Sequence, residues 1–356
     1  MISRRSLLRS AALGLGAPLI NRGRFALFAQ SELAYSALTI DLVRSATVID
    51  MLGLVTLDFR KLSAWQTEPA RFLPADFQKL KDSGITIFHP AVGYTEGDVF
   101  QSSLRDITGW NSLIAAHPDD FLRVNRPGDL PGAKQSGKVG IVIGQQNSMH
   151  FRSVQDVDYF YGLGQRISQL TYRHNRIGGG SSDASDSGLS EYGAQILERM
   201  NTLGMAVDVS HCSDRTTLDA IEASRKPVLI THANCRALVP NSARCKTDDA
   251  IQRAAAKGGV IGVTMVRYFV RPGGSATIED VLDHIEHVVR LVGVEHVGIG
   301  SDFDLDPHPT YDIPGLNHLN RVYELTEGLL RRGYADRDVS LILGGNFERA
   351  LRQIWS

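Results

Sequence analysis

Short apolar runs that end in polar side chains recur along the chain. Eight of them are too short for helices and rich in valine and isoleucine, and they occupy residues 48–52, 85–89, 139–144, 169–174, 206–211, 228–232, 260–266 and 297–302. Runs of this length and composition are typical of buried parallel strands. A closed barrel needs eight such strands, so we predict an α/β fold, a (β/α)8 TIM barrel, with a doubly wound open sheet as the alternative.

Helical apolar spacing separates most of these runs. Residues 75–84 and 192–204 show it and end in glycine, the usual stop signal of a helix, and residues 277–293 repeat the design. Two further helices are expected near the carboxyl terminus, over residues 322–332 and 337–354. Because strands and helices alternate without a long linker, we predict that residues 30–356 form one barrel domain with C-terminal helices.

Three of the runs end in side chains that are able to bind a metal ion. His211 and His232 end consecutive strands, and Asp302 ends the eighth. The active sites of such barrels lie at the carboxyl ends of the strands, so the two imidazoles should be neighbours there. One strand-end histidine alone is more often structural, but two form half of a zinc site. Asp302 is then either a third ligand or the catalytic group that accepts a proton from water.

Two other side chains are candidates for binding substrate. His174 ends the predicted fourth strand, next to the strand of His211, where it would polarise a substrate oxygen during catalysis. Arg244 lies in the loop after the sixth strand, and its guanidinium would hold a carboxylate or an oxyanion. The competitors for this second role are Arg236, Lys246 and Arg267.

The amino-terminal segment predicts export. Residues 3–8 form a twin-arginine start, and residues 11–18 form a short apolar stretch with several small side chains. That stretch is too short to span a hydrocarbon layer of roughly 30 Å. We predict a signal peptide over residues 1–29 with cleavage near Ala29, passage through the twin-arginine export machinery, and a mature protein that is periplasmic or secreted.

The charge balance and the cysteines limit the partners. The 356 residues carry a formal net charge of -1, which gives no reason to expect nucleic acid or a membrane surface as a partner, while a homodimer is compatible with it. The three cysteines, Cys212, Cys235 and Cys245, are predicted to be small buried residues. The alternatives are a Cys235–Cys245 disulfide and a thiolate metal ligand.

Several separated motifs together carry a family resemblance. They occupy residues 188–195, 200–211, 227–238, 298–304 and 344–347. In this order they resemble the membrane (renal-type) dipeptidase family, peptidase family M19, over the chain from about residue 138 to its end. The resemblance implies a barrel of the metal-dependent amidohydrolase type that holds two zinc ions and cleaves dipeptides by metal-activated water.

The resemblance also assigns roles to residues of this chain. His211 and His232 match ligands of the second metal in that family. His174 and Arg244 match its substrate-contacting pair, and Asp302 matches its catalytic aspartate.

The chain departs from the family pattern at the first metal. Leu52 and Leu54 stand where the family has a His-x-Asp pair, and Gln146 stands where it has the glutamate that bridges both metals. Leucine cannot bind zinc, and a neutral amide is a weak oxygen donor. The first metal site is therefore predicted to be missing. The candidate replacement ligands are Gln146, Asp50, Asp58, His89 and His150, with His89 the most interesting because it ends the second strand.

Two functions remain open at this stage. The first is a metal-dependent hydrolase that cleaves a small peptide or amide bond with one zinc ion, or two if replacement ligands exist, since a single metal both activates water and polarises a carbonyl. The second is a catalytically altered relative that binds or matures a peptide-derived metabolite. Opening of a lactone or cyclic amide is a third, weaker option, because barrels host many chemistries.

Overall fold

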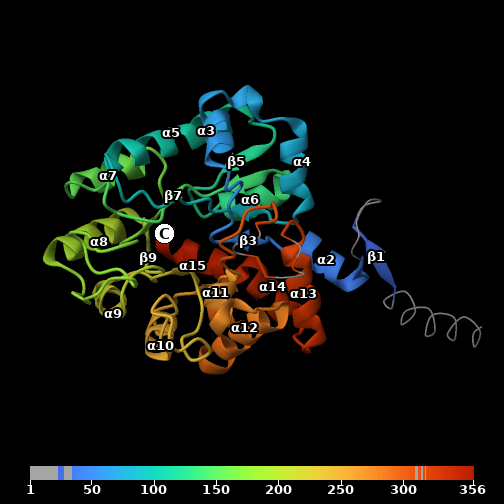
Figure 1. Ribbon diagram of the computed structural model, residues 1–356. Helices are drawn as coiled ribbons and strands as arrows, with labels where there is room; N and C mark the ends of the chain where they lie inside the picture. The colour runs from blue at the N-terminus through green and yellow to red at the C-terminus, as the bar shows by residue number, and fades with distance from the viewer. Residues whose placement is uncertain (1–22, 28–33, 309–311, 314–315, 317) are drawn as a thin grey trace, which may run out of the picture.

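The computed structural model describes residues 23–27, 34–308, 312–313, 316 and 318–356. The predicted twin-arginine start and the predicted cleavage position lie outside these residues. At the amino-terminal end of the described part, β1 (Arg24–Ala26) pairs in antiparallel fashion with β2 (Ala34–Ser36), and this hairpin lies at the margin of the molecule (Figure 1). No helix in the described ranges is long and apolar enough to cross a membrane.

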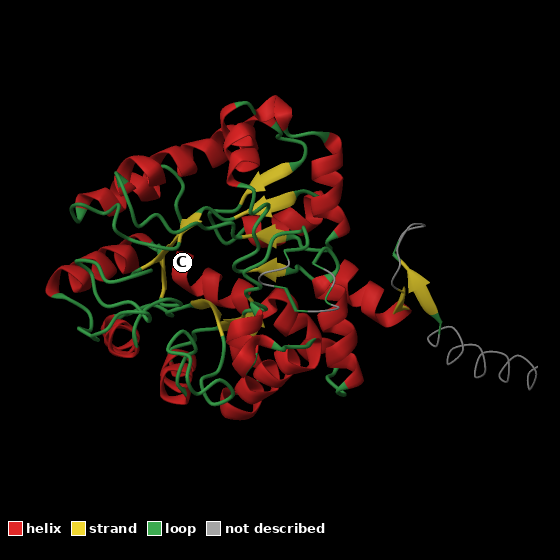
Figure 2. Cartoon of the chain, in the orientation of Figure 1, coloured by secondary structure: helices red, strands yellow, loops and turns green. Residues whose placement is uncertain are grey.

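Parallel strands form a closed barrel, which Figure 2 shows enclosed by helices. In chain order its strands are β3 (Ile49–Asp50), β4 (Ile87–Phe88), β6 (Val139–Ile141) continued by β7 (Gly144–Gln145), β8 (Ile167–Gln169), β9 (Ala206–Asp208), β10 (Ile230–Ala233), β11 (Ile261–Val263) and β12 (Val297–Ile299). Pairing of β12 with β3 and a bridge between Asp208 and Leu229 close the ring. An additional strand, β5 (Phe121–Arg123), pairs with β6. The predicted barrel is therefore confirmed, and the open sheet is not formed.

The fourth strand lies earlier than predicted. It covers Ile167–Gln169, whereas the sequence favoured residues 169–174. The chain turns after this strand because the Asn175 side-chain oxygen accepts a hydrogen bond from the backbone N–H of Ile177, and the Asn175 backbone N–H bonds to Gly178. Such a local turn competes with strand pairing. The placement of His174 at a strand end was therefore wrong.

Helices alternate with the strands and surround the barrel. They are α2 (Ala37–Ser45), α3 (Phe59–Thr67), α4 (Pro74–Asp82), α5 (Val99–Ala116), α6 (Asp129–Ser136), α7 (Gln155–Gly162), α8 (Glu191–Leu203), α9 (Asp214–Ala223), α10 (Asp248–Ala256), α11 (Arg267–Val270), α12 (Ile278–Val292), α13 (Arg321–Arg331), α14 (Asp336–Ser340) and α15 (Asn346–Trp355). The sequence signals set their ends. The Ser190 hydroxyl caps the start of α8, and Gly204 ends it in a left-handed conformation with φ 78°.

The amino-terminal end of the barrel is closed by α15. Phe347, Leu351 and Ile354 of this helix pack in one cluster with strand residues such as Ile49 and Ile87. The predicted helix over residues 337–354 is interrupted at Gly344, where φ is 177° and a Cβ atom would meet the backbone oxygen of Thr47. The base of the barrel is thus sealed, and only its other end is open to substrates.

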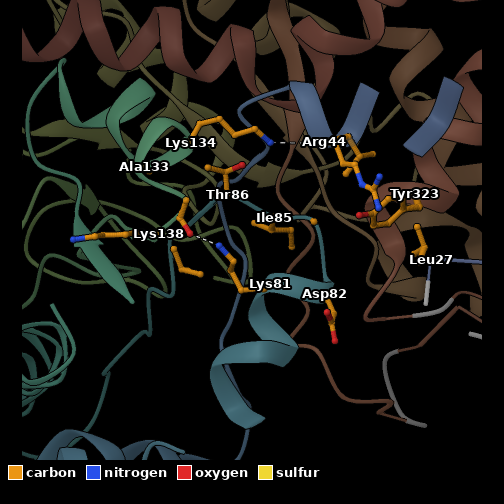
Figure 3. Close-up of a pocket in the computed structure, with 14 residues that line it drawn as sticks. Leu27, Arg44, Lys81, Asp82, Ile85, Thr86, Ala133, Lys134, Lys138 and Tyr323 are labelled. Carbon is orange, nitrogen blue, oxygen red and sulfur yellow. Dashed lines mark hydrogen bonds between the residues drawn. The ribbon is translucent and has the colours of Figure 1, made fainter. Parts of the chain in front are cut away.

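A basic cavity of about 310 Å³ lies between helices at this closed end (Figure 3). The Lys134 ammonium donates to the backbone oxygen of Val43 in α2, and the Lys81 ammonium donates to that of Gly137, which ends α6. Cations near helix C-termini offset the negative end of the helix dipole. Burial lowers the pKa of Lys134. These lysines therefore stabilise helix ends.

A fully buried ion pair joins the first strand to α13. The Arg321 guanidinium lies 3.0 Å from Asp50 Oδ2, and both side chains are 0 % exposed. Replacing Arg321 by methionine leaves the Asp50 carboxylate without its cation, so unfolding in urea should show a loss of about 3–5 kcal/mol. Replacing Arg290, which forms an exposed pair with Glu286, should change little. An equally small effect for both variants would contradict this assignment.

Candidate active site

The open end of the barrel holds a cavity with two lobes. The lobes share Tyr172, His211 and Phe269. The apolar lobe, of about 440 Å³, is further lined by Leu54, Leu57, Phe59, Ala91, Val92, Gly93, Gln146, Val266, Tyr268 and Asp302. The charged lobe, of about 520 Å³, is further lined by Arg173, Ser182, Asp183 and Arg244. Almost all of these residues lie in loops that follow barrel strands, which is where barrel enzymes build their sites.

His211 and His232 meet as the sequence predicted. Their Nε2 atoms are 3.0 Å apart, although His211 follows β9 by a short turn and His232 lies within β10. Burial lowers the pKa of both imidazoles well below the usual value, and the nearby Arg244 guanidinium lowers them further. Both rings are therefore neutral near pH 7, which is the form that binds metals.

A chain of hydrogen bonds sets the tautomer of His232. The Asp208 carboxylate accepts hydrogen bonds from the hydroxyls of Ser210, at 2.6 Å, and Thr231, at 2.8 Å. Because the Thr231 hydroxyl has given its proton to Asp208, it accepts one from His232 Nδ1, 2.8 Å away. The lone pair of His232 therefore lies on Nε2 and points at His211. Outer partners of this kind orient the histidine ligands of metal sites.

Asp302 lies in the apolar lobe on a strained backbone. Its φ is 62°, the only positive value among non-glycine residues of the described ranges, and its N–H donates to the backbone oxygen of Leu52. Strain of this kind is often found at functional sites. Burial raises the pKa of Asp302 to about 7, against the opposing effect of Arg244. The carboxyl is thus able to take up and release a proton near neutral pH.

Arg244 spans the two histidine strands. Its terminal nitrogens donate to the backbone oxygens of Ser210 and His232, both at 2.7 Å, while its Nε is buried without a hydrogen-bond partner among the described residues. The side chain also borders the charged lobe. Its competitors are used elsewhere: Arg236 pairs with Asp214, Lys246 bonds to Cys212 and Thr217, and Arg267 bonds to Tyr268.

The structure does not bring the His174 side chain to the cavity. His174 is exposed, borders neither lobe, and its backbone N–H donates to Asp183. Tyr172 lies beside His211 instead, where its ring stacks on the His211 ring with the centroids 4.1 Å apart. Substrate contact by His174 stays a prediction.

Apolar side chains fill the place of the predicted missing metal. Leu52, Leu54 and Ala91 form a small buried cluster of their own, and Leu57 packs against it. Gln146 lies beside them, and its amide donates to the backbone oxygen of Ala91. Neither leucine has a donor atom, and with the Gln146 nitrogen held by this bond the side chain offers only its neutral amide oxygen, a weak donor.

The candidate replacement ligands do not rebuild the first site. Both Asp50 oxygens accept hydrogen bonds, from Ser301 and from Arg321, so Asp50 has no oxygen left for a metal. His89 donates from Nδ1 to Met51, and its bare Nε2 is covered by Gly144, where a Cβ atom would lie 2.0 Å away.

Two more candidates have structural roles. The Asp58 carboxylate caps α3, and His150 Nε2 lies 3.0 Å from Gln165 Oε1 among buried rings. Among the described residues, no group of three or more His, Cys, Asp or Glu side chains is arranged to hold a metal ion. The described residues thus offer one pair of imidazole donors, His211 and His232, to a metal ion.

The three cysteines are free and buried, as predicted, so the alternative Cys235–Cys245 disulfide is not formed. Burial raises the pKa of the Cys235 thiol. A thiol that resists deprotonation is a poor metal ligand.

The Asp208–Thr231 hydrogen bonds lead to a prediction about metal affinity. Replacing Thr231 by valine keeps the size of the side chain but removes the group that fixes the His232 tautomer. We expect the affinity for Zn²⁺ to fall about 10–100-fold, as is typical when outer partners of metal ligands are lost. Competition with a chelator measures this affinity. Replacing Thr326, a buried threonine of α13 that bonds only within its helix, by valine should leave it unchanged.

Strand order, loop positions and the histidine pair together define an amidohydrolase-type (β/α)8 barrel. Residues 38–356 match the model of the family described as membrane dipeptidase (peptidase family M19). The chain belongs to this family, and the predicted resemblance is confirmed. Members include metallopeptidases, so membership implies a metal cofactor.

Similar proteins agree with this placement. An uncharacterized dipeptidase, C965.12, of Schizosaccharomyces pombe is 31% identical over 269 residues, which cover 73% of this chain and 64% of that protein. The solved structure of an amidohydrolase from Pseudomonas aeruginosa is 31% identical and has a TM-score of 0.78, covering 89% of this chain and 99% of that one. A metallo peptidase from Rhodobacter sphaeroides, liganded with a phosphinate mimic of L-Ala-D-Ala, shares the fold, with 20% identity, a TM-score of 0.75, and 87% and 99% of the two chains covered.

The chain spans less than two thirds of the length of the curated relatives that it matches, between 53% and 65% of each. The family and the fold are shared over that part.

Proposed function

We propose that this protein is a metal-dependent hydrolase of small peptide or amide substrates that works with one metal ion. The observation that carries the proposal is the pair of neutral imidazoles whose Nε2 atoms lie 3.0 Å apart at the open end of the barrel, beside Asp302. The relatives named as dipeptidases support the choice of substrate class.

His211 and His232 would hold the ion through Nε2. Imidazole donors suit zinc, and the Asp208–Thr231 hydrogen bonds leave the His232 lone pair free to bind it. When bound, such an ion activates water and polarises the carbonyl of the scissile bond. Two protein ligands leave coordination positions for water and substrate, although catalytic zinc more often has three protein ligands.

The remaining steps rest on side chains of this chain. Asp302, with its pKa of about 7, would accept the proton of the attacking water and return it to the leaving amine. Arg244 and Arg173, which border the charged lobe, would hold the substrate carboxylate. His174 would join them only after movement of its loop, since it is exposed here.

A second function is favoured by one specific observation. The apolar cluster of Leu52, Leu54 and Ala91 stands where the family places a metal, so the protein would bind or mature a peptide-derived metabolite without hydrolysing it. Under this alternative the cavity is retained and the reaction is lost.

We also propose that the protein is exported by the twin-arginine route and works in the periplasm or outside the cell. The proposal rests on residues 3–18 of the sequence. Export of a folded chain fits a protein that carries a metal.

A dipeptide panel tests the proposed hydrolysis. Purified protein, with Zn²⁺ added and with chelator as control, is incubated with dipeptides, and the release of free amino acids is measured. We expect cleavage only with metal. No cleavage under either condition, together with measurable binding of the same dipeptides, would favour the second function.

A further inference from the structure

We propose that the apolar lobe binds a bulky apolar side chain on the amino side of the scissile bond, so that the substrates are small peptides or amides with an apolar first residue and a free carboxylate on the second. The inference deepens the proposed function and rests on it for the position of the scissile bond. It assigns a use to the apolar wall that Leu54 and Ala91 form at the position of the predicted missing metal.

The first argument is the composition of the lobe. Its wall includes Leu54, Leu57, Phe59, Val92, Val266 and Tyr268, and the only ionisable groups that the described residues add, apart from tyrosine hydroxyls, are His211 and Asp302. No lysine or arginine in the part of the chain that the structure describes borders it. The volume of about 440 Å³ lies within the range of roughly 300–1,000 Å³ of ligand pockets. Such a wall favours apolar groups and opposes the burial of charged ones.

The second argument is that the apolar wall of the lobe extends from a small buried cluster to side chains that stay largely exposed. Leu52, Leu54 and Ala91 form a cluster separate from the main core, and Leu57 packs on it from the cavity side. Above them, Phe59 is 61% exposed and Tyr268 is 46% exposed, and both border the lobe. Large exposed side chains around an apolar wall indicate a surface that a ligand covers.

The third argument is the contrast with the other lobe, which sets the orientation. Arg173, Asp183 and Arg244 border the charged lobe, and His211 and Tyr172 separate it from the apolar lobe. A carboxylate held by the arginines places its own residue in the charged lobe. The preceding residue then extends past His211 into the apolar lobe, with the amide bond between them next to the proposed metal position.

Dipeptides of the form X-Ala test the proposal, with phenylalanine, leucine, glycine, aspartate and lysine at X. Dissociation constants are measured by calorimetry on the wild-type protein without added metal, and kcat/KM is measured with Zn²⁺. Burial of a phenylalanine side chain predicts that Phe-Ala binds on the order of 10- to 100-fold more tightly than Gly-Ala. We expect Asp-Ala and Lys-Ala to bind no better than Gly-Ala.

Variants locate the preference. Phe59→Ser changes a side chain that is largely exposed, so folding should not be affected, and the preference for Phe-Ala over Gly-Ala should fall at least about threefold. Leu54→Asp places a carboxylate in the apolar lobe and should abolish the preference for Phe-Ala over Gly-Ala. The matched control Leu73→Ser, at an exposed leucine outside both lobes, should keep the wild-type ratio.

The outcomes separate this inference from the proposed function. Tight binding of Phe-Ala without cleavage supports the apolar lobe and overturns hydrolysis. Cleavage with equal kcat/KM for Phe-Ala and Gly-Ala, or a preference that Phe59→Ser and Leu54→Asp leave unchanged, overturns the inference and leaves hydrolysis standing.

Discussion

Replacing His211 by alanine is expected to remove both the metal ion and the hydrolytic activity. The remaining imidazole, His232, would hold an ion by a single protein bond, and losing a direct ligand should cost more than the 10–100-fold in affinity typical of an outer partner. Cleavage of a good dipeptide should fall to the background rate in the presence of micromolar Zn²⁺. Elemental analysis and rate measurements on the same sample check both effects.

The control for this variant is His296→Ala. His296 is a partly buried histidine at the closed end of the barrel, where its Nδ1 lies 2.9 Å from the backbone oxygen of Gly259, and its loss should leave metal content and rate unchanged. Thermal unfolding confirms that both variants are folded. A His211→Ala protein that is folded and still cleaves dipeptides at the wild-type rate would show that the reaction does not depend on this pair.

The second large effect is expected for Asp302→Asn, which should lower kcat by about 10²–10⁴-fold with a smaller change in KM. Asparagine keeps the shape of the side chain but cannot accept the proton of water. It also tolerates the left-handed backbone that φ of 62° requires, so the fold should persist.

The pH profile tests the same assignment. A general base acts in its deprotonated form, so kcat/KM of the wild-type enzyme should decrease as pH falls below the pKa of Asp302, which burial raises to about 7. A bound cation would lower this pKa, so the decrease of kcat/KM on the acid side of the profile is expected at pH 7 or below. This acid-side decrease should be absent from the residual activity of Asp302→Asn. An unchanged acid-side decrease in that variant would assign the titration to another group.

The barrel could be predicted from sequence because its signals are local. Short apolar runs and helices that end in glycine each report their own element, and most helix bounds fall within a few residues of the prediction, as α8 at Glu191–Leu203 and α12 at Ile278–Val292 show. The fourth strand was misplaced because the chain turns at Asn175, directly after the run that looked extended, and the Asn175 amide donates to the backbone oxygen of Leu170 inside that run. A side-chain hydrogen bond of that kind does not alter the apolar pattern.

The candidate site was predicted in part. His211, His232 and Asp302 were selected as candidates because they end apolar runs, and the structure brings the two histidines together. Asp208 and Thr231 were missed, although they stand next to them in Asp208-Val-Ser-His211 and Ile230-Thr-His232. Their role depends on hydrogen bonds between two strands, which spacing along one strand does not report.

The substitutions that predict loss of the first metal site were visible in the sequence, but their packing was not. The substitutions at Leu52, Leu54 and Gln146 remove ligands, and only the packing shows that the two leucines form a wall of the cavity with Ala91 and Leu57. Two residues that carry the proposed specificity, Phe59 and Tyr268, come from separate helices, α3 and α11, that follow β3 and β11. Nothing in their local sequence links them.

The metal content of the purified protein tests the central claim most directly. After saturation with Zn²⁺ and removal of loosely bound ions, we predict one equivalent per chain in the wild type and a loss of that equivalent in His211→Ala. Two equivalents in the wild type would contradict the claim, because they would require ligands in place of Leu52 and Leu54. One equivalent that persists in His211→Ala would contradict it as well, because the ion would then lie elsewhere.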